Sequence, residues 1–197
     1  MNHAETIGQV FSELSTGKLE AARNLATQKY PHVPRARIER SYSTEICMRI
    51  FMRDGFIDRY SGDRLLFPAT LRILSIMLPD EFPYQTHWKM DETHIAYWEL
   101  SPTIDHIQPV KRGGKNEESN LVTTSQLRNS AKAHWTLEEL GWKLYPPGNL
   151  TEWDGLLKQS IQYIEAHPSL LEDKLLKKWY KAALQQSKRG YSWMEGL

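Results

Sequence analysis

The residues whose types and spacing could carry chemistry lie between positions 103 and 132, in the stretch TIDHIQPVKRGGKNEESNLVTTSQLRNSAK. An aspartate and a histidine stand side by side as Asp105 and His106, and Asn120 follows in the same stretch. A second asparagine, Asn129, comes nine positions later, and Lys132 follows it at a helical i, i+3 interval. Carboxylate and amide oxygens suit a hard cation, and a neutral histidine can take a proton from water. The set therefore predicts metal-assisted hydrolysis of a phosphodiester.

Local patterns around these residues predict the order strand, loop, strand, helix. TIDHI is β-branched and apolar around its polar pair, which favours a short strand, and NLVTT favours a second one. Between them, the Gly-Gly pair at 113–114 allows backbone angles that other residues resist. SQLRNSAKAH favours one or two turns of helix. In this order the Asp-His pair ends the first strand, Asn120 opens the second, and Asn129 lies on the helix.

Each member of the set is predicted to have its own task. Neighbours on a strand point to opposite faces, so Asp105 and His106 need not both reach a metal. Asp105 and Asn129 are predicted to hold Mg²⁺ or Mn²⁺, which leaves room for waters and a substrate phosphate. His106 is predicted to be the general base, since its ordinary pKa of about 6.5 leaves it mostly neutral. Asn120 is predicted to tie the loop to its own backbone and so orient His106, and Lys132 is predicted to contact a phosphate.

The pattern DHI-P---GG, then NL, then N--K resembles that of the HNH endonuclease family over residues 103–132. The resemblance implies an α+β protein with a small ββα-metal nuclease centre embedded among N- and C-terminal helices. It also implies that Asp105 and Asn129 are the metal ligands and that His106 is the base. Asn120 would then be the structural middle asparagine. Because the last ligand is asparagine where the family often has histidine, the chain looks like an HNN variant.

The chain departs from that family at the positions of a structural zinc. Many relatives hold this zinc with two Cys-x-x-Cys knuckles, one of them in a hairpin that corresponds to residues 56–67 here. Asp58 and Ser61 occupy the first pair of positions, and Ser125 and Arg128 occupy the second. These side chains do not make a closed tetrahedral zinc site, so no structural zinc is expected and packing must hold the hairpin.

The partner expected from the motif is DNA. The formal net charge is +1, so any binding of nucleic acid must come from a local patch. Basic residues predicted to contact the phosphate backbone cluster around the motif: Lys111, Arg112, Lys115 and Arg128. The resemblance favours a DNA endonuclease with a restriction- or defence-related role. A non-catalytic nucleic-acid-binding protein of the same fold and an RNA-directed nuclease are the alternatives. A single nuclease centre cuts one strand each time it binds DNA. Cleavage of both strands would therefore indicate a dimer or sequential nicks, and the oligomeric state stays open.

Three regions are predicted along the chain. Residues 1–54 form an N-terminal helical region, 55–140 the nuclease core, and 150–197 a C-terminal helical pair. Apolar spacing predicts helices at 4–14, 17–29, 43–53, 69–78, 152–166 and 170–187. The C-terminal pair is expected to pack onto its own domain rather than to dimerise.

Two further groups of residues offer competing interpretations. His134 is a rival metal ligand, five positions beyond Asn129. The segment HWKMDETHIAYWEL contains acidic residues, histidines and aromatics that could form a second metal site or stack on bases. An aromatic-rich core segment with its charges in solvent is the favoured interpretation of this segment.

Targeting and redox signals favour the cytoplasm. Cys47 is the only cysteine, which excludes a disulfide framework within the chain. The stretch MNHAETIGQVFSEL has polar residues where a signal peptide needs an apolar core. No apolar run approaches the roughly 20 residues of a membrane span, so no membrane partner is expected.

Overall fold

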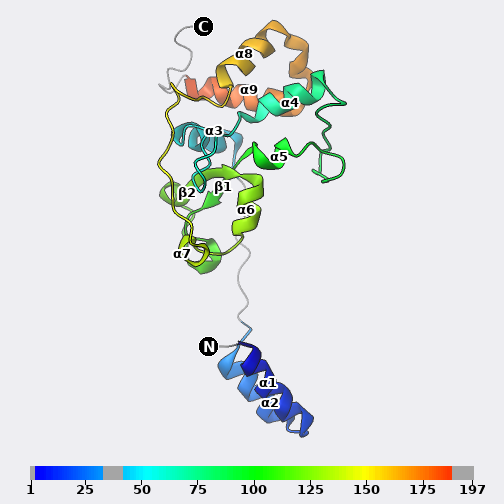
Figure 1. Ribbon diagram of the computed structural model, residues 1–197, viewed down its shortest axis with the longest axis vertical. Coiled ribbons are helices and arrows are strands. Elements are labelled where there is room, and N and C mark those ends of the chain that lie inside the picture. The colour runs from blue at the N-terminus through cyan, green and yellow to red at the C-terminus, as the bar shows by residue number, and fades with distance from the viewer. Residues whose placement is uncertain (1–2, 33–41, 188–197) are drawn as a thin grey trace. The chain divides into compact units, whose positions relative to one another are not determined.

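The computed structural model of the chain describes residues 3–32 and 42–187 (Figure 1). Contacts divide the chain into two compact units, residues 1–41 and residues 42–197. This division comes earlier than the expected boundary after position 54, because α3 (Thr44–Arg53) packs against α9 (Lys174–Ser187) in the larger unit. The first unit contains α1 (His3–Ser15) packed against α2 (Leu19–Lys29), close to the predicted helices.

A helical layer forms the main core of the larger unit. It consists of α3, α4 (Pro68–Met77), α8 (Leu157–Ala166) and α9, together with the 3-10 turn η3 (Pro168–Glu172) (Figure 1). The core includes the fully buried side chains of Met48, Phe51, Leu157, Ile161, Ile164 and Leu176. The C-terminal helices therefore bury their apolar faces on α3 and α4 of the same chain, as expected.

The two C-terminal helices begin later than the sequence predicts, at Leu157 and Lys174 rather than at 152 and 170. Gly155 explains the first difference. Its φ of 70° lies in the left-handed region, and a Cβ there would meet the Phe56 ring at 2.7 Å. The chain therefore turns tightly past Phe56 before α8 can start. At the second helix, Asp173 Oδ1 accepts the backbone N–H groups of Leu175 and Leu176 and caps α9.

The hairpin predicted at 56–67 is reduced to one antiparallel bridge between Ile57 and Arg64. The side chains of Phe56, Leu65 and Phe67 are fully buried. The segment is therefore anchored by its apolar side chains, as expected, although a two-stranded ladder does not form.

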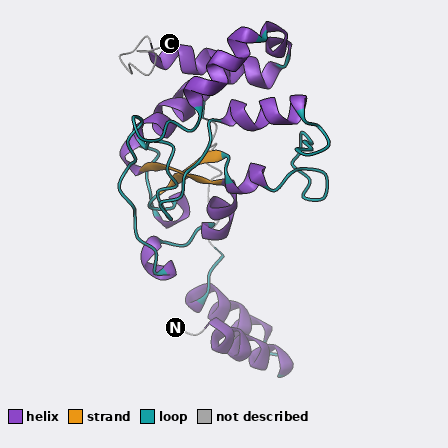
Figure 2. Ribbon diagram, turned by 45° about the horizontal axis from the view of Figure 1, so that its top comes forward, coloured by secondary structure: helices purple, strands orange, loops and turns teal. Residues whose placement is uncertain are grey.

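The predicted strand, loop, strand and helix are present, and the fold is α+β. β1 (Pro102–His106) pairs antiparallel with β2 (Leu121–Ser125), and α6 (Gln126–Lys132) follows directly. The connecting loop contains the short turns η1 (Val110–Arg112) and η2 (Glu118–Asn120). Figure 2 shows the two strands crossing the middle of the larger unit with helices around them. The side chain of Ser125 accepts the N–H of Arg128 and starts α6, and α7 (Leu137–Leu140) comes next.

The aromatic segment between α4 and β1 belongs to a second, smaller core. Trp88 and Trp98 pack with Tyr97 and Leu71 around α5 (Ala96–Glu99). The ring of His94 accepts the backbone N–H of Ala96 through Nδ1 at 3.1 Å. The favoured interpretation of this segment as core is therefore confirmed for its aromatic residues. No helix within the described ranges has the length and apolar character needed to cross a bilayer.

Candidate active site

The end of β1 places the Asp-His pair beside α6. Across the sheet, Asp105 stands opposite Val122 and His106 stands opposite Leu121. The exposed fractions of Asp105 and His106 are only 7% and 4%. Their side chains contact different partners, as expected for neighbours on a strand. Each functional group therefore has its own, nearly enclosed surroundings.

The Asp105 carboxylate is held from one side by two donors. The Tyr60 hydroxyl donates to Asp105 Oδ2 at 2.8 Å, and the Lys132 ammonium lies 2.8 Å from the same oxygen. Burial, and next the charge of Asp105, raise the pKa of Tyr60 far above its usual range, so its hydroxyl stays protonated and donates. Oδ1 accepts no hydrogen bond from the described residues. Oδ2 is thus fixed by two donors, whereas Oδ1 is the oxygen that a ligand such as a metal ion could bind.

Lys132 lies inside the protein rather than on its surface. The residue is 0% exposed, and its ammonium donates to the His106 carbonyl oxygen at 2.8 Å as well as contacting Asp105. A buried ammonium needs a nearby anion, and Asp105 supplies it. In this structure the charge of Lys132 is used inside the protein, and its contact with a phosphate stays a prediction. Lys132 joins the strand end to the last turn of α6.

The His106 ring has two polar neighbours that no local pattern indicated. Its Nε2 lies 3.2 Å from the Tyr42 hydroxyl and 3.1 Å from Asn116 Oδ1. The Tyr42 hydroxyl also donates to Asn116 Oδ1. Asn116 lies in the loop after the Gly-Gly pair, where its polar type does not distinguish it from its neighbours. Tyr42 stands 64 positions before His106, so only the folded chain relates the two.

Asn120 makes the loop contacts that the sequence predicts. Its Oδ1 accepts the N–H of Gln108 at 2.9 Å, and its Nδ2 donates to the carbonyls of Gln108 and Lys115 at 3.0 and 2.9 Å. Gly114 fits beneath this clamp because a Cβ there would lie 1.8 Å from the Gln108 carbonyl oxygen. Asn120 therefore closes the loop by holding Gln108, which lies two residues after His106, and Lys115. A catalytic effect of this closure stays a prediction.

Asn129 completes the candidate metal site. Its Nδ2 donates to the carbonyl of Ile104 at 3.4 Å, a long contact that turns the amide nitrogen toward β1. No described residue donates to its Oδ1. The predicted donor set, one carboxylate oxygen from Asp105 and one amide oxygen from Asn129, suits Mg²⁺ or Mn²⁺ with waters and phosphate as the other ligands. Among residues 3–32 and 42–187, no group of three or more His, Cys, Asp or Glu could form an all-protein cage.

Three of the four zinc-knuckle positions meet in a hydrogen-bonded cluster. Asp58 Oδ1 accepts from the Tyr60 N–H and the Thr124 hydroxyl, and Oδ2 accepts the Ser125 N–H, all within 3.0 Å. The Arg128 Nε lies 3.5 Å from Asp58 Oδ2. Asp58 is 1% exposed, so these contacts compensate a buried charge. The cluster ties the 56–67 segment to β2 and α6.

The absence of a structural zinc stays a prediction with a direct test. We expect protein purified without added metal to contain no stoichiometric zinc, because a carboxylate, two hydroxyls and a guanidinium stand at the knuckle positions. Elemental analysis before and after chelation measures this. Zinc bound at one equivalent that survives chelation would contradict the prediction and redirect attention to His87 and His94.

The basic residues predicted to bind DNA have different surroundings. Arg112 pairs with Glu139 at 2.9 Å, Lys115 pairs with Glu117 at 3.5 Å, and Lys111 is exposed. These three lie on the loop surface, so their contact with DNA stays a prediction. Arg128 instead lies between Asp58 and Asp63, with its guanidinium over the Trp142 ring at 5.6 Å. Its expected contact with a phosphate also stays a prediction.

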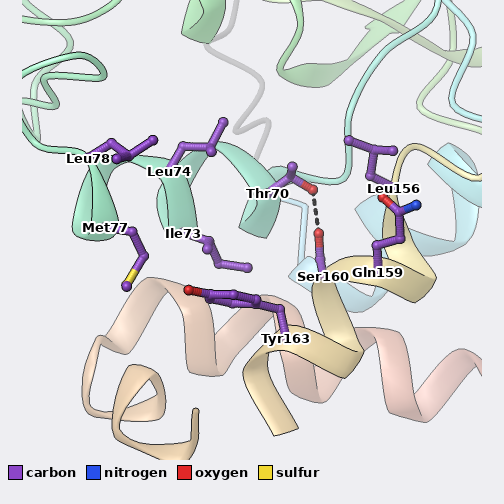
Figure 3. A pocket seen from close by; sticks show the side chains of 9 residues that line it. All are labelled: Thr70, Ile73, Leu74, Met77, Leu78, Leu156, Gln159, Ser160 and Tyr163. Atoms are coloured by element: carbon purple, nitrogen blue, oxygen red, sulfur yellow. Dashed lines mark hydrogen bonds between the residues drawn. The ribbon is translucent and has the colours of Figure 1, made fainter. Parts of the chain in front are cut away.

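The remaining candidates lie away from these contacts. His134 is exposed and stacks on Trp135 with ring centroids 5.5 Å apart, and the structure shows no contact between it and Asp105 or Asn129. A pocket of about 430 Å³ lies between α4 and α8. Its lining is mostly apolar, and the hydroxyls of Thr70 and Ser160 satisfy each other at 2.7 Å (Figure 3). None of the predicted site residues lines this pocket, and its side chains offer no group for hydrolysis.

Comparison with known proteins adds one finding. Residues 93–130 match the family model described as HNH endonuclease. This range includes Asp105, His106, Asn120 and Asn129 and ends before Lys132. No curated protein and no solved structure matches the chain.

Proposed function

We propose that this protein, which carries an HNH endonuclease domain at residues 93–130, is a divalent-metal-dependent endonuclease that hydrolyses phosphodiester bonds in DNA. The family implies phosphodiester hydrolysis and action on nucleic acid. The choice of DNA, of Mg²⁺ or Mn²⁺, of a restriction- or defence-related role and of a cytoplasmic location belongs to the proposal.

One observation supports the proposal: α6, which carries Asn129, contacts the end of β1, which carries Asp105 and His106. Asn129 contacts the carbonyl of Ile104, and Lys132 contacts both Asp105 and the His106 carbonyl. The two candidate ligands and the candidate base are thus fixed by the same short interface between β1 and α6. A proton acceptor beside a hard-cation site is the arrangement that hydrolysis of a phosphodiester needs.

Asp105 and Asn129 are proposed to hold the metal through Asp105 Oδ1 and the Asn129 amide oxygen. When bound, the ion supplies positive charge against the charge that develops on the scissile phosphate. Lys132 already neutralises Asp105, so the protein ligands offer little net negative charge. We therefore expect the site to bind its cation weakly without substrate, since the phosphate brings the missing charge.

His106 is proposed to take the proton of the attacking water. Lys132 fixes the His106 backbone through its carbonyl, and the clamp at Asn120 fixes the loop that begins two residues later. A base whose main chain is anchored on both sides keeps a constant position relative to the ligand set.

A substrate and metal panel tests the function. We expect plasmid DNA to be cleaved with Mg²⁺ or Mn²⁺ and left intact with EDTA, because the ligand set suits a hard cation. Single-stranded DNA and RNA are assayed in parallel, and His106→Ala is expected to be inactive while the exposed-site control His167→Ala behaves like wild type. Cleavage of RNA alone would favour the RNA-directed nuclease. Binding of nucleic acid without any cleavage would favour the non-catalytic protein.

A further inference from the structure

Asn116, in the loop between β1 and β2, and Tyr42, two residues before α3, both contact Nε2 of His106. We propose that Asn116 and Tyr42 are positioning residues that hold His106 in the tautomer with the proton on Nε2. This inference deepens the proposed function and rests on His106 acting as a base. It assigns roles to two residues that the motif does not contain and that are hydrogen-bonded to each other beside the same imidazole nitrogen.

One arrangement of protons satisfies all three contacts. Asn116 Oδ1 is an acceptor only, so its 3.1 Å contact with Nε2 requires a proton on that nitrogen. The Tyr42 hydroxyl donates to the same Oδ1, so its own oxygen faces Nε2 at 3.2 Å as a second acceptor. With Nε2 protonated, the neutral ring carries its basic lone pair on Nδ1. The opposite tautomer would place lone pairs of Nε2 and Oδ1 against each other unless the amide turned over.

The loop side of this contact is itself fixed. Asn116 follows Lys115, whose carbonyl accepts the Asn120 amide at 2.9 Å. Arg49 makes two hydrogen bonds to the Glu118 carboxylate, at 3.2 and 2.7 Å, and Arg53 donates to the Glu118 carbonyl at 3.1 Å. The hydrogen bond from Arg49 lowers the pKa of Glu118, which keeps this carboxylate charged. The loop that carries Asn116 is therefore tied directly to α3.

The start of α3 also fixes the position of Tyr42. This residue comes just before Ser43, whose hydroxyl accepts the N–H of Ile46 and starts α3. The Tyr42 ring lies 6.4 Å from the His106 ring, tilted by 46°, so the hydroxyl reaches Nε2 without stacking on it. Because α3 anchors both the loop and the residue before its own first turn, Tyr42 and Asn116 approach His106 from a common support.

A base held in one tautomer presents the same nitrogen to water in every turnover. Rotation of the ring or exchange of the proton between nitrogens would remove the lone pair from the attacking water. Loss of the acceptor at position 116 should therefore lower turnover rather than substrate binding. The full value of a general base, about 10²- to 10⁴-fold in rate, sets the upper limit of this loss.

The first measurement is spectroscopic and independent of activity. The full chain is labelled with ¹⁵N-histidine, and His106 is assigned by comparison with His106→Gln. At a pH well above the ordinary imidazole value of about 6.5, we expect wild-type Nε2 to give the signal of a protonated nitrogen and Nδ1 that of an unprotonated one. Asn116→Leu should show a mixture of both tautomers, whereas Asn116→Asp keeps an acceptor oxygen and should restore the wild-type pattern.

The second measurement is kinetic. We expect Asn116→Leu to lower kcat by about 10- to 100-fold and Tyr42→Phe by several-fold, with KM nearly unchanged. Asn116→Asp should recover most of the lost kcat. In a His106→Ala background, Asn116→Leu should cause no further loss, because a positioning residue has nothing left to position. The matched controls Asn24→Ala and Tyr163→Phe should leave kcat unchanged, and thermal melts check that each variant is folded.

The outcomes separate this inference from the proposed function. A wild-type chain that cleaves nothing overturns the function, while the tautomer of His106 is still decided by the spectra. A chain that cleaves, needs His106, and keeps its kcat in Asn116→Leu and Tyr42→Phe overturns the positioning role alone. A protonated Nδ1 in the wild type also overturns it, because Asn116 would then donate through its amide nitrogen.

Discussion

His106→Ala is expected to lose about 10²- to 10⁴-fold in turnover while it still binds the divalent metal and DNA, because general-base catalysis is lost and the ligand set is kept. Adding metal should not restore its activity. A variant without the Asp105 carboxylate is expected to lose activity for a different reason, because Asp105 is the charged ligand in the proposed metal site. Cleavage by that variant should recover in part when the Mg²⁺ or Mn²⁺ concentration is raised.

The structure decides which Asp105 variant is informative. Asp105→Ala leaves the buried Lys132 ammonium and the Tyr60 hydroxyl without their acceptor, so it should weaken the fold as well as the metal site. Asp105→Asn keeps the shape and an oxygen, and we expect it to be the better folded of the two. Thermal melts with and without metal separate loss of folding from loss of metal binding.

Asn129 provides an internal comparison. Asn129→Ala should resemble the Asp105 variants in a milder form, since a neutral amide contributes less to binding a hard cation, and Asn129→Asp should be tolerated. The measurement is cleavage rate against metal concentration for every variant. Rescue of His106→Ala by excess metal would mean that the roles of base and ligand are reversed. Wild-type cleavage by all the variants would place the active site elsewhere.

Lys132→Met is expected to destabilise the larger unit by about 3–5 kcal/mol, because it leaves Asp105 buried without its counter-charge. For a unit of this size the corresponding fall in Tm is roughly 10 °C. Divalent metal should restore part of this loss, since the uncompensated carboxylate attracts the cation more strongly. Thermal melts in EDTA and in Mg²⁺ measure both effects.

A matched control and a clear contrary result accompany this prediction. Lys181→Met removes an exposed lysine of α9 and should change Tm little. An unchanged Tm for Lys132→Met, together with a loss of DNA cleavage, would contradict the buried ion pair. It would support instead the surface phosphate contact that the spacing of Asn129 and Lys132 first predicted.

The sequence by itself determined the local architecture of the site. β-branched runs, the Gly-Gly pair at 113–114 and the helical interval between Asn129 and Lys132 each act over a few residues. Strand, loop, strand and helix therefore formed in the predicted order, and Asn120 closed the loop as expected. Sequence patterns of this kind predict local structure because backbone preferences and short-range hydrogen bonds determine that structure.

Only the tertiary structure decided what surrounds the Asp-His pair. Tyr60 and Tyr42 reach Asp105 and His106 from 45 and 64 positions away, and their approach depends on how α3 and the 56–67 segment pack against the sheet. Lys132 became a buried counter-charge because the interface between β1 and α6 excludes water and an ammonium there needs an anion. Burial is a property of the assembled layers, so spacing along the chain could not distinguish this lysine from one at the surface.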